Sequence, residues 1–151
     1  MKTIFSFLML CFTLTLNAQV FTITTQEGNS VIKIGNVTDY KEVLRHPDGA
    51  SMTEVLNAKY VIDLKNKTST FYDNGKLVSV LPFNSISFVD SVYTINLVDY
   101  LLVDPSVKFK TTMVLNIKKD QESLIWFYYN QIRDFTLVQR LTKYQIKKSP
   151  K

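Results

Sequence analysis

From residue 58 onward, the chain consists of short runs of β-branched and aromatic residues separated by turn-forming residues. These runs predict strands at 59–64, 68–73, 76–82, 85–90 and 92–98. Asn74-Gly75, between the second and third runs, favours a tight hairpin because both residues tolerate positive φ. Two earlier runs, 20–25 and 30–34, are joined through the sequence QEGN and predict a further pair of strands. The pattern therefore indicates an antiparallel, mainly β chain.

The clearest alternation of apolar and polar residues covers 107–117, with the sequence VKFKTTMVLNI. Alternate residues, such as Leu115, fall on one side, whereas Lys110 and Thr112 fall on the other. This period of two predicts a strand with one buried face and one mostly polar face. A short connection, KKDQ, leads from this strand into SLIWFYYNQIRDF, which contains four aromatic residues in a row.

The length of that connection decides which aromatic residues face the core. If it is four residues long (118–121), Met113 faces Trp126, and Trp126 joins the core. Phe127 and Tyr129 then stand on the outer face that carries the lysines. A two-residue connection keeps this arrangement, whereas a three-residue connection reverses it. In each register, one aromatic pair is inside and the other lies on the outer face.

The outer aromatic pair needs either a cover or a partner. The cover would be a second sheet, or the segment 38–57 packed over the pair. The partner would be a ligand, because aromatic side chains beside a lysine suit a planar, sugar-like or anionic molecule. The sequence leaves both interpretations open. The ligand-binding residues predicted by the second interpretation are Phe127, Tyr129, Lys110 and Thr112.

The segment 38–57 differs from the rest of the chain because it carries helix-start signals. Asp39 lies three residues before Glu42, and Ser51 lies three residues before Glu54. Both pairs resemble capping boxes, so we expect up to two short helices here. The valine and tyrosine residues of the segment fit strands equally well.

Together, these elements predict a single β-rich domain over residues 19–151. Its fold class is mainly β: a single antiparallel β-sandwich or partly closed β-barrel with up to two short helices. The spacing of the strands does not separate a sandwich from a barrel. A lipocalin-like barrel is one version by analogy alone, because the sequence matches no lipocalin motif.

Residues 1–18 have the order of a secretory signal peptide: Lys2, an uncharged and mostly apolar run (4–16), and a small Ala18 at the cleavage position. The ending LNAQ resembles signal peptides of flavobacteria-like Gram-negative bacteria, and the resemblance is confined to this leader. We therefore expect an exported protein, periplasmic or secreted. The single cysteine, Cys11, lies in the leader, so the mature chain would hold no disulfide and no thiol nucleophile.

The formal net charge of +5 is mildly basic. It implies weak contact with an anionic envelope surface that fades as salt is added. Nucleic acid is not an expected partner outside the cytoplasm. The expected partner is an unknown small molecule or protein. No segment after the leader has the roughly eighteen consecutive apolar residues of a membrane-spanning helix, so none is predicted in the mature chain.

The sequence offers little for conventional catalysis or metal binding. The chain has one histidine, His46, and no cysteine beyond the leader, so ordinary zinc, copper and haem sites lack ligands and no cofactor is expected. The leading interpretation is a small exported non-enzymatic binding or interaction module. One alternative is a carboxylate-based hydrolase that uses His46, Asp99 or Asp104. Another is an envelope structural or accessory component.

Overall fold

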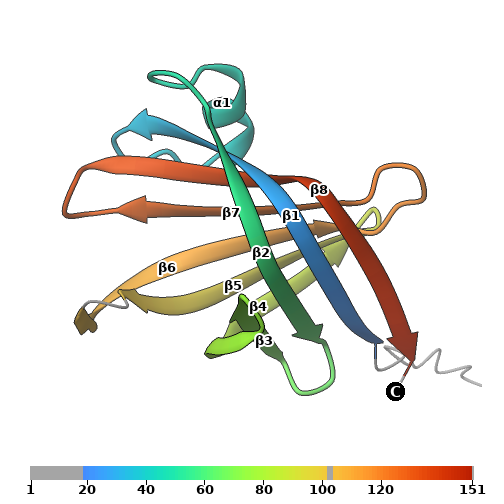
Figure 1. Cartoon of the computed structure of the whole chain (residues 1–151). Coiled ribbons are helices and arrows are strands. Elements are labelled where there is room, and N and C mark those ends of the chain that lie inside the picture. The colour runs from blue at the N-terminus through green and yellow to red at the C-terminus, as the bar shows by residue number, and fades with distance from the viewer. Residues whose placement is uncertain (1–18, 102–103, 151) are drawn as a thin grey trace, which may run out of the picture.

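The protein is a closed antiparallel barrel of eight strands that follow one another in sequence order (Figure 1). The computed structural model describes residues 19–101 and 104–150, so the leader assigned to residues 1–18 lies outside the described residues. The strands are β1 (Gln19–Ile34), β2 (Met52–Asp63), β3 (Thr68–Asp73), β4 (Lys76–Val89), β5 (Val92–Leu101), β6 (Asp104–Asn116), β7 (Ser123–Asn130) and β8 (Phe135–Pro150).

The ladder between the first and last strands closes the wall. β1 and β8 pair from Gln19 with Pro150 to Ile34 with Phe135, almost along their whole length. The mainly β, antiparallel fold class is therefore confirmed, and of the two predicted architectures the structure adopts the barrel. Closure removes the two free outer strands that an open sheet would have.

Two local predictions about strand pairing are confirmed. Asn74 and Gly75 form the tight connection between β3 and β4 with φ of 48° and 77°, the left-handed values that a hairpin of this type requires. β6 and β7 pair in the register expected for the four-residue connection, with Met113 opposite Trp126 and Leu115 opposite Leu124. The indole of Trp126 accordingly packs against the interior core.

Two strands are longer than the sequence predicted. The runs 20–25 and 30–34 belong to the single strand β1, which a bulge between Thr25 and Glu27 interrupts. Gly28 does not make a turn there: it allows close approach, since a Cβ at this position would lie 2.9 Å from Leu56 Cδ1. The runs 76–82 and 85–90 likewise fall in one strand, β4, whose first part pairs with β3 and whose second part pairs with β5.

The segment 38–57 forms one helix, not two. α1 (Tyr40–Arg45) begins where predicted, and the Asp39 side chain accepts a hydrogen bond of 2.9 Å from the backbone N–H of Lys41. The second expected helix is absent because residues from Met52 onward belong to β2 and pair with β1. A ladder satisfies these backbone groups, which an isolated helix of one or two turns does poorly. α1 itself is far shorter and more polar than a bilayer-crossing helix, and no described helix has that length and apolarity.

α1 covers part of the outer surface of the barrel (Figure 1). Beneath it lies a small cluster of buried residues that β1, β6, β7 and β8 contribute together with the helix: Val31, Val43, Val114, Ile125 and Val138. Phe127 belongs to the edge of this cluster and packs on Tyr40, with ring centroids 5.7 Å apart. The predicted cover by segment 38–57 is therefore confirmed for Phe127.

Inside the barrel, the side chains divide into two regions. The packed half is the interior near the ends of the chain, where Phe21, Ile62, Tyr93, Leu115 and Leu124 are almost fully buried. The hollow half is the interior toward the opposite ends of the same strands, and it contains a cavity.

Candidate functional site

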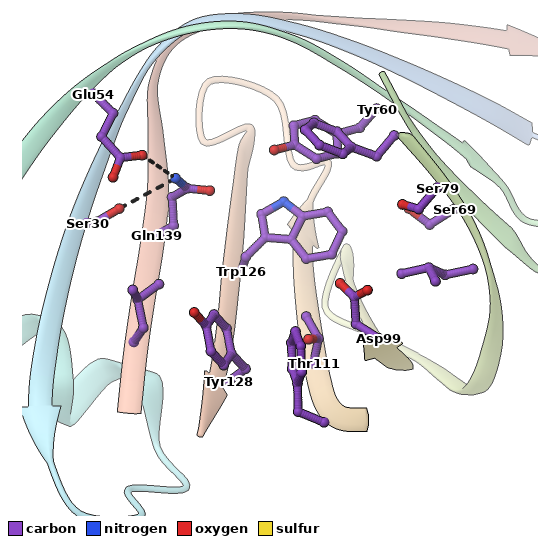
Figure 2. Close-up of a pocket in the computed structure, with 14 residues that line it drawn as sticks. Ser30, Glu54, Tyr60, Ser69, Ser79, Asp99, Thr111, Trp126, Tyr128 and Gln139 are labelled. Carbon is purple, nitrogen blue, oxygen red and sulfur yellow. Dashed lines mark hydrogen bonds between the residues drawn. The ribbon is translucent and has the colours of Figure 1, made fainter. Parts of the chain in front are cut away.

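The cavity in the hollow half has a volume of about 360 Å³ and is partly open to solvent. All eight strands contribute to its wall, each with one or two inward-facing side chains. Figure 2 shows Trp126 in the middle of the site, with Glu54 and Gln139 on one side and Ser69 and Ser79 on the other. A volume of this size and a partly apolar wall suit one small organic ligand.

Aromatic rings make up much of the wall. The ring of Tyr60 stacks on Phe71 at 5.0 Å between centroids and lies 5.2 Å from the ring of Trp126. Phe109 and Tyr128 form a second pair, with centroids 4.9 Å apart. Because these rings come from β2, β3, β6 and β7, a flat or aliphatic group inside the cavity would contact aromatic surface from several directions.

A polar cluster crosses three strands at one side of the cavity. Gln139 Nε2 on β8 donates to Glu54 Oε2 on β2 at 3.0 Å and to Ser30 Oγ on β1 at 3.4 Å (Figure 2). The amide therefore fixes one oxygen of the Glu54 carboxylate. A carboxylate has about four lone-pair positions, so Glu54 keeps the capacity to accept further hydrogen bonds.

Two buried polar atoms of the cavity wall have no hydrogen-bond partner among the described residues: Thr111 Oγ1 and Trp126 Nε1. Thr111 is only 3% exposed, and both residues line the cavity. An unsatisfied buried donor or acceptor costs about 1–3 kcal/mol, so such atoms usually have a water or ligand partner. The indole N–H can only donate, whereas the hydroxyl can donate and accept.

The charged groups of the cavity wall are both acidic. Glu54 and Asp99 line it, and none of the described lining residues is basic. Burial, with smaller contributions from Glu54 and Asp73, raises the pKa of Tyr60 to about 12. Burial also raises the pKa of Tyr128, Asp99 raises it to a lesser extent, and the charge of Arg133 lowers it slightly. Both phenols are neutral near neutral pH, as ordinary tyrosines are, so the acidic groups of the described wall are the carboxyl groups of Glu54 and Asp99.

The four ligand-binding residues predicted from the sequence lie together, but outside the barrel. Phe127, Tyr129, Lys110 and Thr112 all line a hollow of about 740 Å³ on the outer surface of β5, β6 and β7, which we call the outer groove. Lys108 lines it as well, so its basic side chains contrast with the acidic interior. The binding role of these residues stays a prediction.

Two hydroxyls of the outer groove already form hydrogen bonds within the protein. Thr112 Oγ1 donates to Asn96 Oδ1 at 2.8 Å, and the Tyr129 hydroxyl donates to Asp134 Oδ1 at 2.7 Å. That hydrogen bond is the main cause of the raised pKa of Tyr129. The outer groove would therefore bind through its lysines and the exposed parts of its rings more than through these hydroxyls.

The residues considered for catalysis are not brought together as a set. His46 is the exposed C-cap of α1 and does not line the cavity. Asp99 does line it, together with Glu54, which sequence analysis had placed in a helix. Asp104 begins β6, and its side chain lies outside the described part of the structure. Among the described residues, no three histidine, cysteine or acidic side chains gather as metal ligands.

Sequence reasoning missed the polar residues of the cavity because they form no motif. Ser30, Ser69, Ser79, Thr111 and Gln139 come from five different strands. The available signal was their position: each occupies an inward-facing position of its strand, where the packed half has apolar residues. Only the closed barrel brings them together.

Comparison with known proteins gives no relative for this site: no family model, no curated protein and no solved structure matches the chain.

Proposed function

We propose that the protein is a small exported binding protein that holds one small molecule in the cavity of its barrel. The observation that carries the proposal is the pair of buried, unpartnered polar atoms, Thr111 Oγ1 and Trp126 Nε1, in a partly open and largely aromatic cavity. A ligand that fills the cavity would satisfy both atoms and bury the surrounding rings. The signal-like leader supports export.

Native mass spectrometry of the protein purified gently from its own cells tests this proposal. We expect an added mass that disappears on denaturation. The variant Ser79→Phe, which places a ring in the cavity, should lose the added mass. Ser87→Phe makes the same change at an exposed position of β4 and should keep it. An added mass that persists in Ser79→Phe would place the ligand elsewhere.

The outer groove is a second candidate binding site because Lys108 and Lys110 stand beside Phe127 and Tyr129. It would take a planar or sugar-like molecule that carries negative charge. The double variant Phe127→Ala/Tyr129→Ala should then abolish binding and leave the barrel folded. If the variant unfolds, these two residues serve the fold and this candidate fails.

A carboxylate-based hydrolase is the alternative that the cavity itself supports, because Glu54 and Asp99 line the same space. It predicts that the bound molecule is released in altered form, and that Glu54→Gln and Asp99→Asn retain the unaltered molecule. A binding protein releases it unchanged.

An envelope structural or accessory role has a different basis. Several large apolar side chains are exposed, including Val55 at 91% and Ile132 at 71%. This role predicts co-purification with a fixed second protein, and Val55→Ser should weaken that association without affecting the cavity.

A further inference from the structure

We infer that the cavity selects an organic cation: an amine with a compact apolar body, whose ammonium group is attracted by the carboxylates of Glu54 and Asp99. This inference rests on the proposed function and specifies the ligand class. The cavity has two acidic residues and five aromatic residues in its wall, and no basic one among the described residues that line it.

The charge balance of the wall argues against an anion. A carboxylate or phosphate placed in the cavity would be repelled by Glu54 and Asp99, and none of the described residues that line the wall is basic. The positive charge of Arg133 acts on Tyr128 in the wall, but Arg133 does not line the cavity. In a partly desolvated site, such repulsion is stronger than at the surface. An ammonium group would instead gain from both carboxylates, and hydrogen bonds to charged groups are the stronger kind.

The two carboxylates reach the cavity from different parts of the wall. Glu54 is on β2 and Asp99 is on β5, and Figure 2 shows them on opposite sides of the Trp126 indole. The Gln139 amide holds Glu54 in place. An amine that enters this space therefore lies near a carboxylate while its body remains against the central indole.

The aromatic wall suits the same class of ligand. Ammonium groups are attracted to the faces of tryptophan and tyrosine rings, and the attraction grows as water is removed. Tyr60 and Tyr128 are neutral near neutral pH, as phenols ordinarily are, and their raised pKa values extend this to higher pH, so they offer neutral rings and hydroxyls. An apolar body packed against Trp126 would bury ring surface at the same time.

The buried unpartnered atoms add one requirement. Trp126 Nε1 donates only, and Thr111 Oγ1 can either donate or accept. A hydroxyl or carbonyl oxygen elsewhere on the amine would satisfy the indole N–H. Amines that also carry such an oxygen should therefore bind more tightly than simple amines.

Three probes of similar size test the charge preference directly: phenethylamine, the neutral phenethyl alcohol and the anionic hydrocinnamate. Trp126 is the only tryptophan, so its fluorescence reports on the cavity, and calorimetry gives the affinity. We expect phenethylamine to bind at least about tenfold more tightly than hydrocinnamate, with the alcohol between them. Glu54→Gln and Asp99→Asn should each weaken amine binding by about tenfold.

The matched control is Asp120→Asn, which removes one negative charge from an exposed loop and keeps a residue that tolerates the positive φ of 64° there. It should bind phenethylamine as the wild type does, and near-ultraviolet circular dichroism should confirm that all three variants are folded. Hydrocinnamate binding that equals amine binding, or amine binding that neither cavity variant weakens, would overturn the cation preference while leaving a binding barrel in place. A lack of response to all three probes would also overturn it, and the native mass shift would then decide the proposed function separately.

Discussion

The packed half and the hollow half of the barrel are built from the same strands, yet the inward side chains are apolar in the first and include polar and acidic residues in the second. β5 contributes the buried Tyr93 and Leu97 to the packed half, and Asp99 to the cavity. β6 contributes the buried Met113 and Leu115 to the packed half, and Thr111, the inward position before Met113, to the cavity. Both halves alternate inward and outward residues with the same period. The difference shows that one half supplies stability by burying apolar area, whereas the other gives up that stabilisation to keep a polar space open.

The largest test of this division compares two leucine truncations. Leu115→Ala removes a fully buried side chain from the packed half and should lower the free energy of unfolding by about 2–5 kcal/mol. Leu137→Ala, in the cavity wall, should cost less than half as much because it enlarges a space that already exists. Urea unfolding of the two variants provides the comparison. Equal losses would contradict the distinction between the halves.

A second test uses Tyr60, whose ring joins the core and also lines the cavity. The folded-state pKa of about 12 lies above the ordinary value of 10.0. The folded protein therefore holds the proton to higher pH than the unfolded chain does, and the associated stability is complete below about pH 10 and is lost as the pH rises toward 12. Across this range, wild type should lose about 2–3 kcal/mol more stability than Tyr60→Phe. Parallel curves for the two proteins would mean that the phenol ionises freely in the fold.

The outer side of the same wall gives a third test, because Phe127 is covered by α1 and Tyr129 is not part of that cluster. Phe127→Ala should lower the free energy of unfolding by about 1–3 kcal/mol, less than a fully buried phenylalanine would. Tyr129→Ala should cost less than Phe127→Ala, chiefly the lost hydrogen bond to Asp134. Denaturant titration of the two single variants would show whether the covered side chain contributes more to the free energy of unfolding than the exposed one. A negligible cost at Phe127 would leave both rings available for binding in the outer groove.

The smallest test uses two adjacent threonines with opposite surroundings. Thr111 Oγ1 is buried without a described partner, so Thr111→Val should raise the free energy of unfolding by about 1 kcal/mol. Thr112 Oγ1 donates to Asn96, so Thr112→Val should lower it by about 1 kcal/mol. Calorimetric melting temperatures would show the opposite signs. A lower melting temperature for Thr111→Val would indicate that a bound water or ligand already satisfies the hydroxyl.

Much of the fold followed from local patterns in the sequence. The alternation at 107–117 predicted the strand, and of the registers left open the structure has the one expected for a four-residue connection, with Met113 opposite Trp126. Asn74-Gly75 gave a hairpin because its conformational preference is local. Predictions were wrong where a residue that resembles a local signal has its role in the tertiary structure. The glycine in QEGN suggested a turn but makes room for Leu56. Glu54 suggested a helix start but faces the cavity.

Much less of the candidate site than of the fold could be predicted from the sequence. Phe127, Tyr129, Lys110 and Thr112 were placed together because they sit on two neighbouring strands whose register could be derived. The cavity draws on all eight strands, so its composition depends on barrel closure and on the tilt of each strand. No segment of the chain contains that information by itself.

The pairing of the first strand with the last also governs the order in which the protein can fold. The contacts between Gln19 and Pro150 join residues at opposite ends of the described chain, and such distant contacts form slowly. Hairpins such as β3–β4 can form early, but the wall stays open until β8 reaches β1. During synthesis, neither the cavity nor the closed barrel can exist before β8 has emerged. A chain that lacks one strand would therefore form an open sheet with two unpaired strand edges. We expect it to aggregate, and not only to be less stable.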